Sequence, residues 1–267
     1  QSFISQWGWR VTFILTGLLV LVILLPLNGL FLKHKPEDIG EYVDGVKDDE
    51  PPPEKNGPFL ASPTDPGVEW TMRKVLPSAR FWFLMGFTFF SVMGIYLILV
   101  HNVRFLVDQG VPKMTAAMVF ALVGVISSGF RIFWGWLSDR IGREMTFTLG
   151  VLCGCLGVAS LMLIETTGEK AFVYAFSILF GMGWGGTAPM FIAVAADLFK
   201  GRIFGLIYGL VEAGVGVAGA FGAWVAGYIF DKTQSYQGAF ILVITVLLLS
   251  CVFIWLAAPR KYRGQSG

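Results

Sequence analysis

Long apolar runs dominate the chain, and short polar stretches separate them. Seven runs are long enough to cross a bilayer core, which takes roughly 20 apolar residues in helical form. They lie at about 11–32, 81–102, 114–137, 145–164, 171–196, 203–230 and 238–258. They lack the alternation over about ten residues that is typical of membrane-barrel strands. The pattern predicts an all-α fold, a polytopic helical bundle with seven transmembrane helices.

The polar segment after the first run has a different composition. Residues 33–80 hold ten of the 18 acidic residues and three consecutive prolines from Pro51. Such a segment cannot bury enough apolar surface to fold alone, so it is interpreted as a linker with a short interfacial helix near 70–76. Because the chain starts with Gln and without a charged leader, we interpret it as the C-terminal portion of a longer protein. The chain is thus expected to have four parts. Residues 1–32 are the last helix of an N-terminal bundle, 33–80 the linker, 81–258 a six-helix C-terminal bundle and 259–267 a cytoplasmic tail.

Composition and charge place the protein in a membrane and give its orientation. Only 14% of the residues are charged and the mean hydropathy is +0.68, whereas soluble domains have about 25% charged residues. Fourteen of the 20 Lys and Arg residues fall on the side that holds the linker and the C-terminus, and five fall on the other. Short loops rich in Lys and Arg stay cytoplasmic. We therefore expect a multi-pass protein of the cell (inner) membrane with a cytoplasmic linker and C-terminus.

A charged turn, WGWLSDRIGRE at 134–144, joins the third and fourth runs. Gly135 and Gly142 would allow close helix approach and a tight reversal of the chain. Asp139 could accept hydrogen bonds from helix N-terminal amides and attract cations.

Further charges are expected at the same membrane side. Arg140 and Arg143 could reach carboxylates on neighbouring helix ends, with Asp197 as the candidate partner, and Arg202 completes the cluster. Two interpretations stay open. The cluster is either a topological anchor or an inner gate, whose charge pairs form when the cytoplasmic side closes and break when it opens.

Arg131 is a charge inside a spanning helix, which costs several kcal/mol unless it faces a cavity or a partner. At helical spacing its neighbours Gly124, Ser127, Ser128 and Gly135 form a small, polar stripe. That face would line water or a close helix. Alternatively Arg131 snorkels to the inner surface, because it lies about six residues, roughly 9 Å, from the expected helix end.

Glu212 is the one acidic residue deep within an apolar run, about eight residues or roughly 12 Å from its start. Arg131 and Glu212 are thus expected at similar depth on different helices. Either they form a static ion pair that fixes packing, or Arg131 holds an anion while Glu212 carries a proton. In the second case, occupancy of Arg131 would change the protonation of Glu212.

Other signals are weaker. The glycines between 181 and 186, followed by Pro189, predict a kinked helix, and Tyr96, placed at the outer end of the second run, is a further cavity candidate. The only histidines, His34 and His101, are expected on opposite membrane sides, and the G-x-x-x-x-G-K-[ST] nucleotide loop is absent from the sequence. These features argue against an enzyme or a pump, and predict no cofactor, no metal and no nucleic-acid partner.

The turn carries a family resemblance. GWLSDRIGRE at 135–144 resembles the G-x-L-[AS]-D-R-x-G-R-[RK] signature of the major facilitator superfamily, with Glu144 in place of the last basic residue. Its position corresponds to the copy between the eighth and ninth helices of that family. The resemblance implies that the chain corresponds to helices six to twelve of a twelve-helix carrier.

The pattern F-R-x-x-x-G-x-L-S-D-R is similar to that of the monocarboxylate and oxalate–formate branches. This resemblance implies that Arg131 binds a substrate carboxylate. From their places along the helices, Tyr96, Ser127 and Ser128 are candidates for further substrate contacts, and Glu212 or a residue of the missing half would handle protons. Ser127 stands where some monocarboxylate carriers hold an acidic residue. The oxalate–formate exchangers' Lys has no counterpart in 203–230, which favours a monoanion over a dianion.

The expected function is secondary active transport of a small organic anion, monocarboxylate-like, by alternating access. The mode would be proton-coupled symport or anion exchange. The expected partners are a carboxylate substrate, protons, the lipid bilayer and an N-terminal bundle of the same protein. Two alternatives stay open, a major facilitator carrier of a different solute class and a non-transporting polytopic membrane subunit.

Overall fold

The computed structural model describes residues 2–31, 70–169, 171–199, 201 and 203–259. Regular structure in these ranges is entirely helical, and seven helical segments there are long and apolar enough to span a membrane. This confirms the all-α prediction and each of the seven runs. The segments are Trp7–Leu30, Ala79–Asp108, Lys113–Ile141, Arg143–Thr167, Ala171–Leu198, Phe204–Thr233 and Gln237–Ala257.

The chain divides into two compact units, Gln1–Ala61 and Ser62–Gly267. The first contains helix α1 (Ser2–Phe31), which is interrupted at Gly8 by a non-helical conformation with φ 74° and ψ 161°. Beyond Gly8, the hydroxyls of Thr12 and Thr16 donate to backbone carbonyls one turn earlier. The described side chains of α1 are mostly apolar and mostly exposed within this unit. Such a helix needs lipid or other helices around it.

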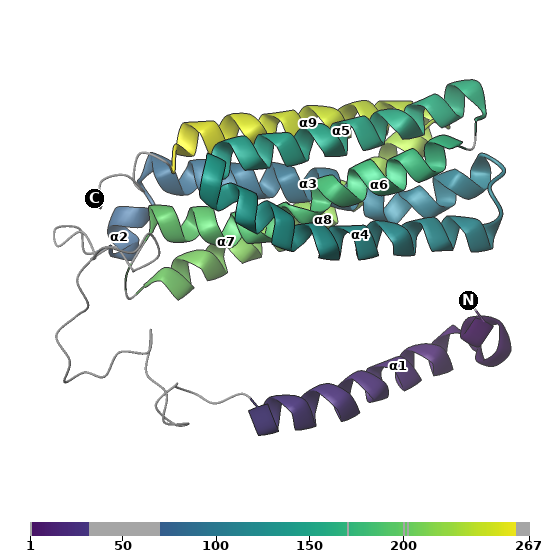
Figure 1. The fold of residues 1–267 in the computed structure, drawn as a ribbon, viewed down its shortest axis with the longest axis horizontal. Coiled ribbons are helices and arrows are strands. Elements are labelled where there is room, and N and C mark those ends of the chain that lie inside the picture. Colours follow the sequence, from purple (N-terminus) through teal and green to yellow (C-terminus); the bar gives the residue numbers. More distant parts are fainter. Residues whose placement is uncertain (1, 32–69, 170, 200, 202, 260–267) are drawn as a thin grey trace. The chain divides into compact units, whose positions relative to one another are not determined.

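The second unit begins with α2 (Met72–Val75), which is the short helix expected near 70–76. Six spans follow, and Figure 1 shows them as a bundle of long helices. They are α3 (Ala79–Asp108), α4 (Lys113–Ile141), α5 (Arg143–Thr167), the pair α6 (Ala171–Gly185) and α7 (Thr187–Leu198), α8 (Phe204–Thr233) and α9 (Gln237–Ala257).

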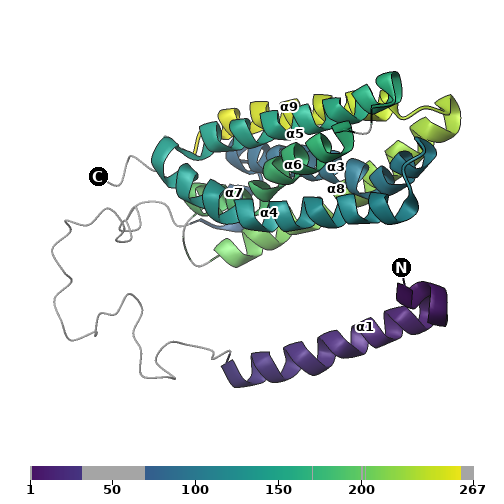
Figure 2. The same cartoon turned by 45° about the vertical axis from the view of Figure 1, so that its right-hand side comes forward.

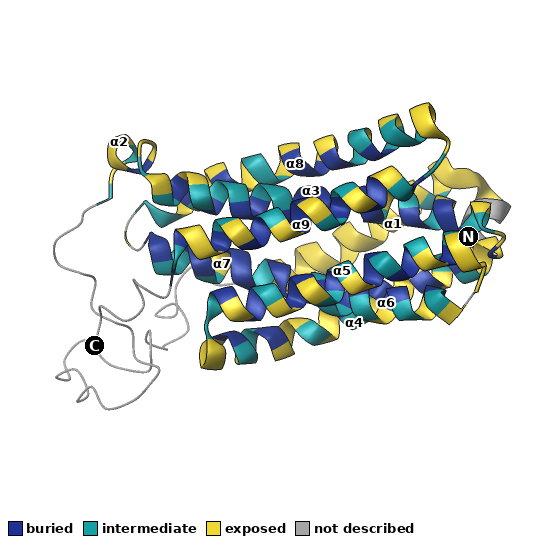
Figure 3. Ribbon diagram, turned by 90° about the horizontal axis from the view of Figure 1, so that it is seen from above, coloured by how far each residue is buried: buried dark blue, intermediate teal, exposed yellow. Residues whose placement is uncertain are grey.

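Packing within the bundle follows two sets of contacts. Helices α8 and α9 pack on α3, while α4 and α5 pack on α6, and α5 also contacts α9. Figure 1 and Figure 2 show α9 and α5 along one side of this unit and α4 and α7 along the opposite side. Seen from above in Figure 3, α8 and α4 lie along opposite edges.

The two edge helices are also the least buried spans of the bundle. Only 22% of the central window of α4 and of α8 is buried, whereas the figure for α3 is 56%. A helix with so little contact in its own bundle must face lipid, water or another bundle. The residues that the sequence singled out, Arg131 and Glu212, lie on these two helices.

Small residues set the closest approaches in the core. A Cβ added at Gly183 of α6 would lie 2.6 Å from the backbone of Gly150 and of Gly154 on α5. Small residues are favoured at such contacts because lipid offers no hydrophobic drive for helix association. The adjoining core contains Phe87, which makes edge-to-face contacts with Phe147 and Phe191.

Candidate functional site

Arg131 is exposed on α4. It lies 18 residues after the first residue of this 29-residue helix, which is in the middle third of its length. The helix extends to Ile141, so Arg131 is ten residues, about 15 Å, from the C-terminal end of α4 rather than the six residues and 9 Å expected. The ion pairs of the described residues do not include Arg131. The structure therefore leaves a guanidinium without a carboxylate partner at mid-helix.

Only part of the small, polar stripe expected around Arg131 lies on the exposed face of α4. Ser128 is exposed and donates to the Gly124 carbonyl at 2.9 Å. Ser127 is instead 1% exposed, and its hydroxyl has no hydrogen-bond partner in the described structure. A Cβ at Gly135 would meet nothing within 4 Å, so the close helix approach expected at this glycine does not occur within the described bundle.

Glu212 is exposed on α8, eight residues after Phe204, at the depth of about 12 Å that the sequence predicted. The side chain of Tyr208, one turn earlier, interacts with it. No ion pair of the described residues joins Glu212 to Arg131, and their helices occupy opposite edges of the bundle (Figure 3). The static ion pair considered from the sequence is therefore wrong.

Tyr96 lies 17 residues after the start of the 30-residue α3, near the middle of the helix and not at its outer end as expected. Its ring is 47% exposed and packs on α8 at Gly219, where an added Cβ would lie 3.4 Å away. Tyr96 and α8 line a groove of about 260 Å³. The α8 residues of this groove are Val215, Gly216, Gly219, Ala220 and Ala223. The groove could not be predicted from the sequence, because spacing along one helix does not show which ring covers its glycines.

The turn between α4 and α5 is a compact polar cluster. Gly142 has φ 93°, a value that favours glycine, which confirms the tight reversal. The Arg143 guanidinium donates to Ser138 Oγ at 2.6 Å and to Asp139 Oδ1 at 2.8 Å. It also donates to Asp197 Oδ2 at 3.2 Å. The expected pairing with Asp197 is confirmed, and it joins the ends of α4, α5 and α7.

The other members of the cluster differ from expectation. The Arg140 guanidinium lies 4.3 Å from the centre of the Trp136 ring, and none of the ion pairs between described residues includes it. It therefore stacks on an indole four residues earlier instead of reaching a carboxylate. Arg202 lies outside the described residues.

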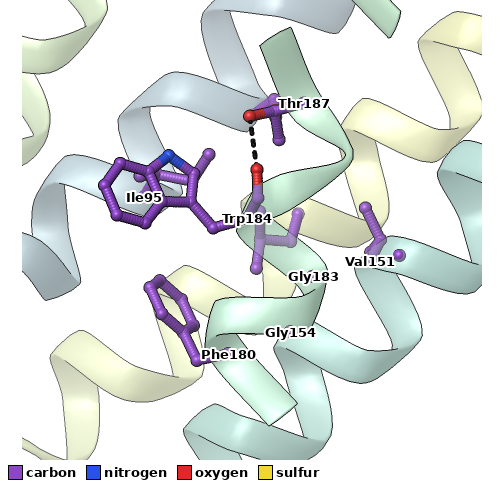
Figure 4. Close-up of a pocket in the computed structure, with 10 residues that line it drawn as sticks. Ile95, Val151, Gly154, Phe180, Gly183, Trp184 and Thr187 are labelled. Atoms are coloured by element: carbon purple, nitrogen blue, oxygen red, sulfur yellow. Dashed lines mark hydrogen bonds between the residues drawn. The ribbon is translucent and has the colours of Figure 1, made fainter. Parts of the chain in front are cut away.

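The span 171–198 is broken, as its glycines and Pro189 predicted. The Gly186 N–H donates to the Gly183 carbonyl at 3.3 Å, and Pro189 has no N–H to offer the Gly185 carbonyl. Figure 4 shows the Thr187 hydroxyl bonded to the Trp184 carbonyl, at 2.8 Å.

A cavity beside this break measures only about 20 Å³. By this measure of volume, about 10–15 Å³ is enough to hold one water, so the cavity has room for about one. An organic anion therefore does not fit between the helices here.

The far end of the bundle is closed by aromatic side chains. Tyr236, in the connection between α8 and α9, stacks on Phe230 and lies edge-on to Phe105. Burial raises the pKa of Tyr236, and the negative charge of Asp108 adds to this effect.

Comparisons with known proteins agree with this architecture. A family model described as Major Facilitator Superfamily matches residues 1–208 and 185–267. The oxalate:formate antiporter of Oxalobacter formigenes is 25% identical over 191 residues, which are 71% of this chain and 45% of that protein. Monocarboxylate transporter 11 of Mus musculus is 30% identical over 176 residues, 62% of this chain and 38% of that protein.

A solved structure has the same fold. It is the crystal structure of an auto-inhibited POT family peptide transporter, with a TM-score of 0.59 and 20% identity over 69% of this chain and 37% of that chain. The chain spans less than half the length of each of these proteins. Because the family model covers nearly all its residues, the chain belongs to the Major Facilitator Superfamily.

Proposed function

We propose that the whole protein is a secondary active transporter of small organic monoanions, such as monocarboxylates, and that it works by alternating access. The observation that carries the proposal is Arg131, exposed at the middle of a spanning helix and without a carboxylate partner among the described residues. A guanidinium binds a carboxylate through paired, charge-assisted hydrogen bonds.

The exposure of α4 and α8 supports this proposal. A charge facing hydrocarbon is costly, whereas a charge facing water between two helical bundles is not. Alternating access requires two bundles that move about a central site. The weakly buried faces of α4 and α8 would face the partner bundle across that site. The cytoplasmic position of the linker and C-terminus belongs to the same proposal.

The substrate class rests on charge and on the relatives. Between the two ends of α4, Arg131 is the one cation, and the segment 203–230 contains no Arg or Lys, so one carboxylate is matched and a second is not. The curated relatives named above are an oxalate:formate antiporter and a monocarboxylate transporter. Both names support a carboxylate substrate.

Uptake into proteoliposomes by the full-length protein tests the proposal. Labelled lactate, pyruvate, formate and oxalate would be offered with and without a pH gradient. We expect uptake of a monoanion, and a loss of about tenfold or more in Arg131→Ala, because a charged hydrogen-bond pair contributes on the order of 1.5–3 kcal/mol. Arg104→Ala is the matched control, because that arginine pairs with Asp108 at the far end of α3. Wild-type uptake by Arg131→Ala would refute the anion site, and transport of none of the four acids would favour another solute class.

Glu212 is proposed to carry the coupling proton. Glu212 lies on the opposite edge of the bundle from Arg131 (Figure 3), so it would carry the proton at its own position on the exposed side of α8, without contact with the bound anion. Glu212→Gln should abolish accumulation driven by a pH gradient while preserving exchange of internal for external substrate. Glu169→Gln, an exposed glutamate beyond α5, is the control. Gradient-driven accumulation by Glu212→Gln would exclude this role.

A further inference from the structure

The indole of Trp134 ties α4 to the break between α6 and α7. Trp134 is 3% exposed, and its Nε1–H donates to the Met182 carbonyl at 2.7 Å. In an uninterrupted helix the Gly186 amide would donate to that carbonyl. Here the Gly186 N–H turns to Gly183, so the indole replaces the donor that the break has removed.

The same face of α4 lies directly against the glycines of the break. A Cβ at Gly185 would lie 2.6 Å from the Ser127 carbonyl oxygen. A Cβ at Gly186 would lie 3.4 Å from the Trp134 ring. Contacts this close leave α4 little freedom to rotate about its axis.

Rotation of α4 decides the surroundings of Arg131. An α-helix turns about 100° per residue, so Arg131 lies only about 40° around the helix from Ser127 and about 60° from Trp134. Both neighbours are buried, while Arg131 is exposed. Arg131 therefore stands at the edge of the buried face, where a modest rotation would turn it toward α6.

We infer that Trp134 is a positioning residue for the anion site. Its hydrogen bond to the Met182 carbonyl sets the rotation of α4 and presents the Arg131 guanidinium to the substrate. The inference rests on the proposed function of Arg131. The new element is the link between the break and the anion site: the hydrogen bond from Trp134 to Met182 connects the break in the span 171–198 to the helix that carries Arg131.

The first test needs no substrate. In the full-length protein freed of other reactive cysteines, Arg131→Cys is combined with Trp134→Phe, which keeps an aromatic ring but removes the N–H. We expect the introduced thiol to react with a water-soluble methanethiosulfonate reagent about threefold or more slowly than in the Trp134 background, the scale of one hydrogen bond. The matched control is Trp82→Phe, which also removes an indole bond to a backbone carbonyl, that of Leu76. Equal rates with and without Trp134→Phe would overturn the inference.

The second test measures transport. With Arg131 in place, Trp134→Phe should raise KM for the transported acid about threefold to tenfold and change kcat by less than about twofold. A fall in kcat at constant KM would overturn the positioning role. If the wild-type protein carries no acid, the proposed function fails, and the labelling rates still decide the role of Trp134.

A second variant keeps the labelling test decisive if Trp134→Phe does not accumulate in the membrane. Gly185→Ala places a Cβ against the Ser127 carbonyl and so displaces α4 at the same contact. As with Trp134→Phe, the thiol introduced by Arg131→Cys should be labelled more slowly in the Gly185→Ala background. An unchanged rate in this variant also counts against the inference.

Discussion

At the scale of single residues, Arg143 shows how one side chain joins three helix ends. Its guanidinium bonds Ser138, Asp139 and Asp197 while remaining only 14% exposed. Charge-assisted bonds at such partly buried positions contribute more than surface ion pairs. All of these partners lie in the second compact unit. The cluster therefore stabilises the packing of three helix ends within that unit.

Arg143→Gln should destabilise the protein by about 2 kcal/mol, because it removes two ion pairs and leaves Asp197 only 15% exposed without its partner. The measurement is the Tm of the purified full-length protein in detergent. Arg140→Gln is the control, because Arg140 is exposed and stacks on Trp136; a contact of this kind is worth about 0.5–1 kcal/mol. Equal decreases of Tm in the two variants would contradict a stabilising role for the Arg143 ion pairs. An unchanged Tm together with slower transport in Arg143→Gln would instead support the gate interpretation.

At the scale of helices, glycines decide which pairs come into contact. Gly183 lets α6 meet the backbone of α5, whereas Gly129, on the exposed side of α4, has nothing within 4 Å of an added Cβ. Gly183 is one of four glycines between 181 and 186, whereas Gly129 has no glycine within four residues, but the sequence shows for neither which helix lies against it.

Gly183→Ala should therefore lower the free energy of unfolding by about 1–3 kcal/mol, the usual cost of overpacking a core. Gly129→Ala should be neutral or stabilising by up to about 1 kcal/mol, because alanine favours a helix and meets no neighbour. Tm values of the two variants in one detergent provide the comparison. A stable Gly183→Ala protein would show that α5 and α6 separate at little cost.

At the scale of the whole molecule, charge asymmetry predicts orientation. The linker, the α4–α5 turn and the C-terminus carry most of the Lys and Arg, which favours the cytoplasmic side. Cysteines introduced at Ser62 and Glu169 should lie on opposite membrane sides. In right-side-out vesicles an impermeant thiol reagent should label Glu169→Cys at once and Ser62→Cys only after permeabilisation. The reverse pattern would invert the topology and the proposed gate.

The sequence by itself determined the helices and singled out the charges within them, because a lipid bilayer requires long apolar helices and a charge inside such a helix is rare. The seven spans, the reversal at Gly142 and the break before Pro189 could be read from local pattern. The pairing of Arg143 with Asp197 followed from expecting both charges at the same side of the membrane. The predicted positions of Arg131 and Tyr96 along their helices were less accurate, because α3 and α4 continue beyond the residues where their apolar runs end.

Only the tertiary structure decided which faces meet. It separated Arg131 from Glu212 onto opposite edges (Figure 3), buried Ser127 beneath α6 and joined Trp134 to Met182 across 48 residues. The physical reason is that helix rotation and neighbour choice depend on glycine contacts and on backbone groups freed at a break. Those contacts form between segments far apart in the chain, and spacing along a single helix does not record them.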